Sequence, residues 1–116
     1  DLPALFANTM DAQSRIQEIG AKLHDLVWPM PLHKPYLRFL KSDVADLANA
    51  ASIGLGGAIT AALFLQEFVP DEISWAHFDL YCWNGMRQKG TPPGGAAQAV
   101  FSVYQYIFEL SGGRPC

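Results

Sequence analysis

The stretch SWAHFDLYCWN, residues 74–84, alternates apolar side chains with polar or aromatic ones, and this pattern constrains the fold most strongly. Successive side chains of a β-strand point to opposite faces of its sheet. A strand over Ser74–Tyr81 places one apolar set on a single face: Ala76, Phe78 and Leu80. The other face then carries His77 and Asp79 among aromatic residues, either as a catalytic pair or as the second side of a packed sheet.

Three segments have the composition of helices. Asp11–Asp25 carries apolar residues at helical spacing after N-cap side chains, which predicts an amphipathic helix. Gly56–Val69 is apolar almost all round and ends at Pro70, which predicts a helix buried on most sides. The last predicted helix is Ala96–Leu110, stopped by two glycines. Its expected buried residues are Ala99, Val100, Val103, Ile107 and Leu110.

The remaining segments are shorter and depend on turn chemistry. Leu2–Asn8 is an apolar run that fits a buried strand. Trp28–Pro35 contains three prolines, which predicts an extended connector over the surface. Tyr36–Ser42 fits one or two helical turns, and Asp43–Ala50 favours a short strand. Asn84–Gly95 is rich in glycine and proline and predicts a loop.

The order of these elements indicates an α/β fold. Strands separated by helices imply parallel pairing through crossover connections. We expect a three-layer α/β/α fragment with a small mixed or parallel sheet of two to four strands and three main helices. The 116 residues suit one domain, yet so small a sheet suggests that more chain or another subunit completes it. Because the chain begins at Asp1 and not Met, we expect a fragment or a processed product.

Composition excludes several classes of function. The net charge is −3, and eight basic residues form no run, so nucleic acid is not an expected partner. No apolar stretch approaches the ~20 residues of a membrane-spanning helix. Cys82 and Cys116 form no disulfide framework, which favours a cytoplasmic location.

The local candidates for chemistry favour structural roles. His77 and Asp79 stand side by side on a strand without a nucleophile elbow, so we interpret the histidine as part of the sheet layer. The possible metal ligands lack the spacing that places two of them on one ion. They are His24, His33, His77, Cys82 and Cys116.

Two further patterns are incomplete. The glycines of residues 54–57 precede a helix but match neither the dinucleotide fingerprint nor the P-loop, so they favour a tight turn and close packing. Asp43 and Asp46 lie beside Asn49, but two carboxylates are too few for a closed oxygen cage.

The three tryptophans fit core or interface anchors better than stacking platforms. They are Trp28, Trp75 and Trp83.

An ordered set of stretches nevertheless resembles the carboxyl-terminal part of the leucyl aminopeptidase family, the cytosol aminopeptidases. The stretches are DLPALFAN, VWPMPL, LKSDVADLAN, GGAITAALFLQEFV and WAHFDL. The resemblance covers about residues 1–80 well and the remainder loosely. It implies a three-layer catalytic domain that removes amino-terminal residues from peptides. It also implies two divalent metal ions, zinc or manganese, that polarise the scissile carbonyl and activate water, and a homo-oligomer, usually a hexamer.

The family's metal and catalytic residues lie in stretches like GKGITFDSGG and NTDAEGR, which do not occur here. They would precede Asp1, so no catalytic or metal residue is carried over. By resemblance, Tyr81 and Asn84 line the pocket for the substrate's first side chain. The family's common Ala-Gly is replaced by Tyr81 and Cys82, which puts a simple leucine preference in doubt.

Two hypotheses follow for residues 1–116. The first is the carboxyl-terminal portion of a metalloaminopeptidase catalytic domain, inactive alone and binding no metal itself. The alternative is a non-catalytic α/β interaction module derived from that family.

Overall fold

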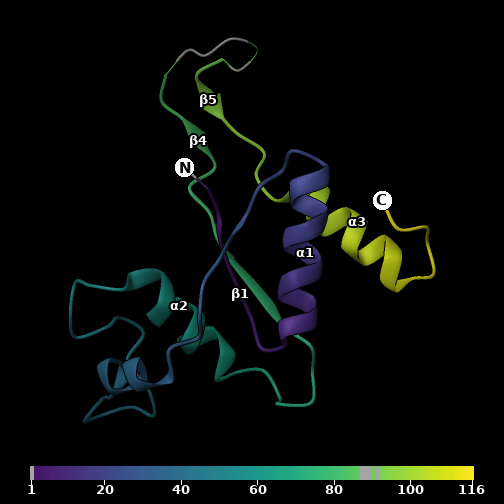
Figure 1. Ribbon diagram of the computed structural model, residues 1–116. Coiled ribbons are helices and arrows are strands. Elements are labelled where there is room, and N and C mark those ends of the chain that lie inside the picture. The colour runs from purple at the N-terminus through teal and green to yellow at the C-terminus, as the bar shows by residue number, and fades with distance from the viewer. Residues whose placement is uncertain (1, 87–89, 91) are drawn as a thin grey trace.

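The computed structural model describes residues 2–86, 90 and 92–116, which form a layered structure around a small sheet (Figure 1). The elements in chain order are β1 (Ala4–Ala7), α1 (Met10–Lys22), β2 (Trp28–Pro29), the 3-10 helix η1 (Lys34–Leu40), α2 (Gly57–Gln66), β3 (Ala76–Asp79), β4 (Trp83–Asn84), β5 (Gly94–Gly95) and α3 (Val100–Leu110).

β1 is the central strand of a mixed three-stranded sheet with the order β2-β1-β3. It runs parallel to β2 and antiparallel to β3, where Leu5 lies opposite Phe78. The predicted α/β class with a small sheet is confirmed, but parallel pairing is correct only for β2. One helix, α1, returns the chain from β1 to β2 in the same direction. Both η1 and α2 lie between β2 and β3, and β3 enters reversed.

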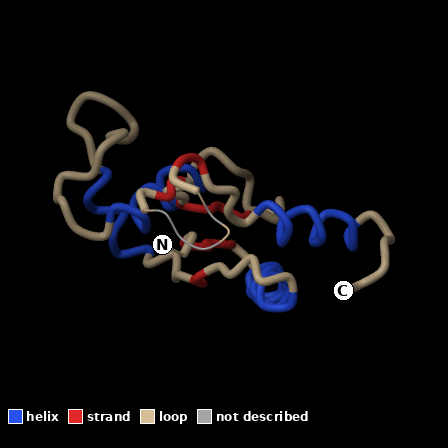
Figure 2. The backbone as a smooth tube through the Cα atoms, turned by 90° about the horizontal axis from the view of Figure 1, so that it is seen from above, coloured by secondary structure: helices blue, strands red, loops and turns tan. Residues whose placement is uncertain are grey.

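Helices lie on both sides of this sheet, as Figure 2 shows from above. On one face, Leu5 forms a core cluster with Ile16 of α1, Val27 and Ala99, and Phe78 packs against it. On the other face, Phe6 is fully buried and stacks on His77 of β3. α1 and α3 contact each other, and α2 contacts η1 and β3. The three-layer arrangement therefore follows from the alternation of side chains along β1 and β3.

α1 confirms the predicted amphipathic helix but ends three residues early. The Thr9 side chain accepts a hydrogen bond from the Ala12 amide at its start. At its end, His24 adopts a left-handed φ of 56° and the Asp25 amide donates to the Gly20 carbonyl. A Cβ atom on Gly20 would lie 2.6 Å from the Asp25 carbonyl oxygen, so glycine permits this close reversal.

The reversal places Asp25 at the amino end of α3. Its carboxylate accepts hydrogen bonds from the Ala99 amide at 2.8 Å and from the Ser102 amide at 2.9 Å. It also accepts one from the Ser102 hydroxyl at 3.1 Å. Ala99, the N-cap residue, has no side-chain acceptor of its own and adopts a φ of 60°. Asp25 therefore supplies the cap of α3 from another element.

A second polar contact joins α1 and α3 farther along the two helices. Arg15 of α1 donates to both carboxylate oxygens of Glu109, at 2.7 and 2.8 Å. The Arg15 guanidinium, with a further hydrogen bond from Gln105, lowers the pKa of Glu109 to about 2. Bidentate pairs of this kind are directional, so this one helps set the crossing of α1 and α3.

The predicted burial of α3 is wrong for Val100, Ile107 and Leu110. Only Ala99 and Ser102 are buried, and Val103 packs partly against the core. Val100, Ile107 and Leu110 expose 53%, 58% and 71% of their surfaces. The helix turns its small Ser102 side toward Asp25, which leaves the apolar stripe uncovered by the described residues.

α2 begins one residue after its predicted start, ends three residues before its predicted end, and is buried on fewer sides than expected. Thr60, Ala62 and Leu63 are buried, whereas Leu65 is 42% exposed. Phe68, just beyond the helix, is 67% exposed. The described chain therefore covers one side of this apolar helix, as it does with α3.

Three shorter segments differ from expectation. Asp43–Ala50 forms no strand, because the Ser42 hydroxyl accepts from the Val44 and Ala45 amides and holds a turn. The proline-rich connector contains β2, whose Trp28 amide donates to the Pro3 carbonyl. The loop over residues 84–95 contains the pairing of β4 with β5, as far as its described residues show.

Replacing Asp25 with alanine should destabilise the fold by about 2 kcal/mol, because three charge-assisted hydrogen bonds at a helix start are lost. Urea unfolding followed by circular dichroism measures the change. The control is Asp43→Ala, an exposed aspartate on the loop before α2. Equal midpoints for the two variants would contradict the capping role.

Candidate functional site

His77 lies in an aromatic stack on the α2 side of the sheet. Its ring centroid is 6.1 Å from that of Phe6 and 6.0 Å from that of Trp75, with interplanar angles of 26° and 11°. Burial lowers the pKa of His77 below 6.5, and the nearby Asp79 carboxylate partly opposes this. No hydrogen bond joins the two side chains in the described part of the molecule. This geometry fits a packing residue rather than a general base.

The candidate metal ligands are dispersed. His24 lies in the reversal after α1, and His33 stacks edge-on against Tyr36. Cys82 is half-buried after β3, and Cys116 is exposed at the end of the chain. Within residues 2–86, 90 and 92–116, no three His, Cys, Asp or Glu side chains come close enough to hold one ion.

The glycines before α2 serve backbone geometry. Gly56 has a φ of 66°, and a Cβ atom there would lie 2.8 Å from a ring carbon of Tyr36. The Thr60 hydroxyl donates to the Gly56 and Gly57 carbonyls. Asp43 and Asp46 are exposed on the preceding loop. The tight turn that the glycines favoured is therefore present.

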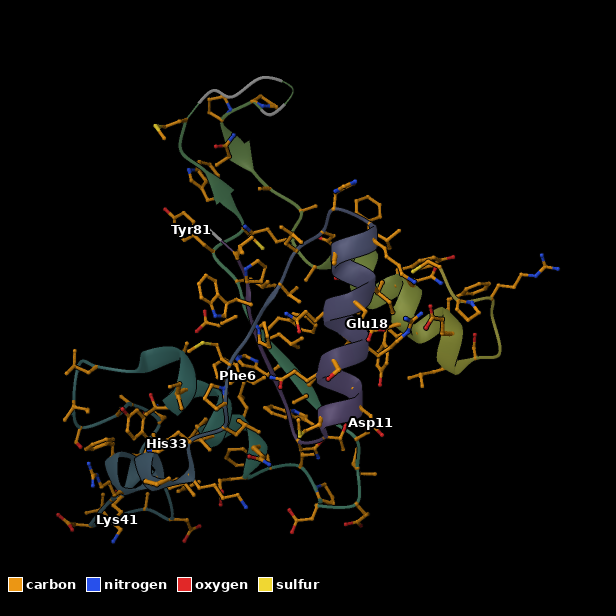
Figure 3. The ribbon with its side chains drawn as sticks, in the orientation of Figure 1. Phe6, Asp11, Glu18, His33, Lys41 and Tyr81 are labelled. Atoms are coloured by element: carbon orange, nitrogen blue, oxygen red, sulfur yellow. The ribbon has the colours of Figure 1, made fainter. Side chains whose placement is uncertain are left out.

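Tyr81 and Asn84 lie just after β3, where the chain enters the β4–β5 hairpin. Figure 3 shows Tyr81 at the foot of this hairpin, on the side away from α1, and its side chain is 74% exposed. Asn84 donates to the Pro92 carbonyl at 2.9 Å and accepts from the Met86 amide. The two residues therefore flank one bend, with Asn84 tied into the hairpin and Tyr81 free to contact another molecule.

The bend between them rests on a strained residue, Cys82, which stands where the family resemblance places a glycine. Cys82 adopts a φ of 52°, which is uncommon for a residue with a side chain. Its amide donates to the Gln98 side-chain oxygen at 3.0 Å, and its carbonyl accepts from the Ala96 amide at 2.9 Å. These bonds fix the direction in which Tyr81 leaves β3.

The three tryptophans are not uniformly core residues. Trp75 packs on His77, whereas Trp28 and Trp83 expose 61% and 56% of their surfaces.

Among the described residues, no helix is long and apolar enough to cross a membrane.

We expect His77 to titrate below 6.5 and to be neutral at pH 7, because its stacked ring is partly removed from water. Asp79→Asn should lower that pKa further, since it removes the carboxylate that favours the imidazolium. The pH dependence of the histidine ring proton resonances measures both values. A pKa above 7 in the unchanged chain would indicate a functional His–Asp pair.

Known proteins with similar sequences and structures identify the family of this chain. The model of the cytosol aminopeptidase family's catalytic domain matches residues 1–103. The probable cytosol aminopeptidase of Nitratidesulfovibrio vulgaris is 38% identical over 94% of this chain, and that of Desulfovibrio desulfuricans is 44% identical over 97%. The chain spans 22% of the length of each of these relatives.

Solved structures with a similar fold point to the same family as the sequence relatives. The cytosol aminopeptidase from Coxiella burnetii matches with a TM-score of 0.89 and 47% identity, over 93% of this chain and 24% of that one. The bottromycin maturation enzyme BotP, solved in complex with Mn, matches with a TM-score of 0.87 and 30% identity, over 95% of this chain and 25% of that one. The chain therefore belongs to the cytosol aminopeptidase family.

Proposed function

We propose that this chain is the carboxyl-terminal segment of the catalytic domain of a metalloaminopeptidase, which releases amino-terminal residues from peptides. One observation carries the proposal: 93% of the chain matches a quarter of the Coxiella burnetii cytosol aminopeptidase with a TM-score of 0.89. The names of the relatives also support a cytosolic enzyme. The segment would complete the catalytic domain rather than catalyse by itself.

The proposed metal ions are two divalent cations, zinc or manganese, and the complex of BotP with Mn supports this class of ion. The described residues of this chain offer no group of three ligands for such a site. We therefore assign the metal ligands to the remainder of the polypeptide. When bound, the ions would polarise the scissile carbonyl and activate water.

The contribution of this chain to catalysis is the wall of the substrate pocket. Tyr81 leaves the end of β3 with an exposed phenol ring, and Asn84 holds the hairpin beside it. An aromatic ring at this position would limit the size of the substrate's first side chain. No proton transfer is assigned to either residue.

A second candidate function is a non-catalytic interaction module. The exposed apolar side of α3 supports it, since large uncovered apolar surfaces mark contact sites. The same surface is compatible with a homo-oligomer. In a free-standing module, this surface would bind a separate partner. In a segment of a larger protein, the rest of the same polypeptide would cover it.

The test of the enzyme proposal is complementation. A chimera in which this chain replaces the matching quarter of the Coxiella burnetii protein should hydrolyse leucine amide in the presence of manganese or zinc. The chain alone, and the Coxiella burnetii protein without that quarter, should give no metal-dependent turnover. An inactive chimera that folds and binds metal would favour the interaction module.

Replacing Tyr81 with alanine in the chimera should change the preference between leucine and phenylalanine amides by about tenfold or more, in favour of the larger side chain. Tyr81→Phe is the control, because it keeps the ring and should keep the preference. The measurement is kcat/KM for each amide. An unchanged ratio in the alanine variant would place Tyr81 outside the pocket.

A further inference from the structure

Gln98 joins the start of α3 to the segment that leaves β3. It precedes Ala99, the N-cap of α3, and it lines an apolar cavity of about 390 Å³ together with Phe78 and Leu80. From this half-buried position, its side-chain oxygen accepts a hydrogen bond from the Cys82 amide at 3.0 Å. The two residues are 16 positions apart in the sequence. One side chain therefore fixes the loop after β3 to the start of α3.

This hydrogen bond acts on the peptide group that follows Tyr81. A peptide group is planar, so the Cys82 N–H and the Tyr81 carbonyl turn together. Holding the N–H restrains the ψ angle of Tyr81, and the pairing of β3 fixes the chain before it as far as Asp79. The Tyr81 side chain is 74% exposed, and among the described residues no hydrogen bond holds its phenol group. The direction of the ring therefore depends on the backbone on either side of it (Figure 3).

The turn at Cys82 is one that needs such a restraint. Its φ of 52° is a left-handed conformation that a side chain disfavours and that glycine adopts readily. Strained backbone persists where the surrounding structure holds it. Here Gln98 holds the Cys82 amide, and the Ala96 amide donates to the Cys82 carbonyl at 2.9 Å. Without the bond to Gln98, the backbone would relax toward a negative φ and turn Tyr81 to a new direction.

The base of the Gln98 side chain is itself anchored. The amide of Ala99 donates to the Asp25 carboxylate at 2.8 Å, and Ala99 is only 3% exposed. Because this cap fixes the backbone beside Gln98, the side-chain oxygen reaches Cys82 from a fixed origin. A continuous series of contacts therefore runs from the end of α1, through Asp25 and Gln98, to the residue after Tyr81.

We propose that Gln98 is a positioning residue of the substrate pocket. It holds the turn at Cys82 so that the Tyr81 ring limits the size of the substrate's first side chain. The inference rests on the proposed function, in which Tyr81 forms the wall of that pocket. Gln98 contacts no substrate in this role and acts only through Tyr81. A residue that served folding alone would instead change the activity toward all substrates alike.

The selectivity test replaces Gln98 with methionine in the chimera. Methionine has a similar length and suits an apolar cavity, but its thioether is a weak acceptor for the Cys82 amide. The ratio of kcat/KM for phenylalanine amide to that for leucine amide should rise about threefold or more, because a loosened wall admits the larger side chain. Gln98→Glu keeps an acceptor oxygen and should keep the ratio of the unchanged chimera.

Two further variants separate positioning from folding. In a chimera that already carries Tyr81→Ala, Gln98→Met should change the ratio by less than about twofold, because residues that act as one unit are not additive. Gln105→Met is the matched control, because the bonds of Gln105 to Glu109 and to the Arg114 carbonyl lie within α3 and the segment after it. It should leave the ratio unchanged. An unchanged ratio with Gln98→Met, an equal change with Gln105→Met, or the same change with and without Tyr81 would overturn the proposal.

Hydrogen exchange in the chain alone tests the same contact without catalysis. The Cys82 amide should exchange about tenfold faster, or faster still, in Gln98→Met than in the unchanged chain, because a protecting bond is lost. Gln98→Glu should retain the protection, and the ring resonances of Tyr81 should shift in the methionine variant only. Equal exchange in all three chains would contradict the positioning role. An inactive chimera with the expected exchange and ring shifts would count against the proposed function and leave the positioning contact supported.

Discussion

The carboxylate of Asp25 joins the end of α1 to the start of α3 across 74 and 77 positions of sequence. Hydrogen bonds to an ionised acceptor are stronger than neutral ones, and a helix amino end favours negative charge. Because the methyl side chain of Ala99 cannot accept a hydrogen bond, Asp25 supplies the acceptor at the start of α3. Gly20 allows the close reversal that brings Asp25 there. The position of α3 over the sheet therefore depends on this contact.

The uncovered surfaces follow from that position. With Ser102 turned toward Asp25, the apolar stripe of α3 faces away from α1. In the described sheet β1 is the central strand, and an apolar cavity of about 390 Å³ lies between Phe78 and Leu80 on one side and Val100, Val103 and Tyr104 of α3 on the other. A composition that is 50% apolar is high for so small a core. The excess lies on surfaces that a larger catalytic domain would bury.

The spacing of apolar residues predicted those helices and strands that can be recognised without knowing which segments they pack against. α2, β1 and β3 lie within their predicted segments, and α1 begins one residue before its own, because alternation and helical spacing are properties of one segment. The prediction failed for Val100, Ile107 and Leu110 because α3 is apolar on most sides, and the contacts of Ser102 with Asp25 and of Glu109 with Arg15 decide which side faces α1. β2 was hidden by Pro29 and Pro31, although a parallel edge needs donors only at alternate residues such as Trp28 and Met30.

The geometry of the candidate site was likewise predictable from local sequence only in part. Alternation placed His77 and Asp79 side by side, but the stack with Phe6 depends on the register of β3 against β1. The direction of Tyr81 depends on the left-handed Cys82 and its bond to Gln98, which no local pattern announces. Tyr81 lies two residues beyond β3, so the register of β3 against β1 sets where this segment starts and the turn at Cys82 sets where it leads. The position of Tyr81 is therefore decided by contacts between separate segments, which the pattern of any one segment does not predict.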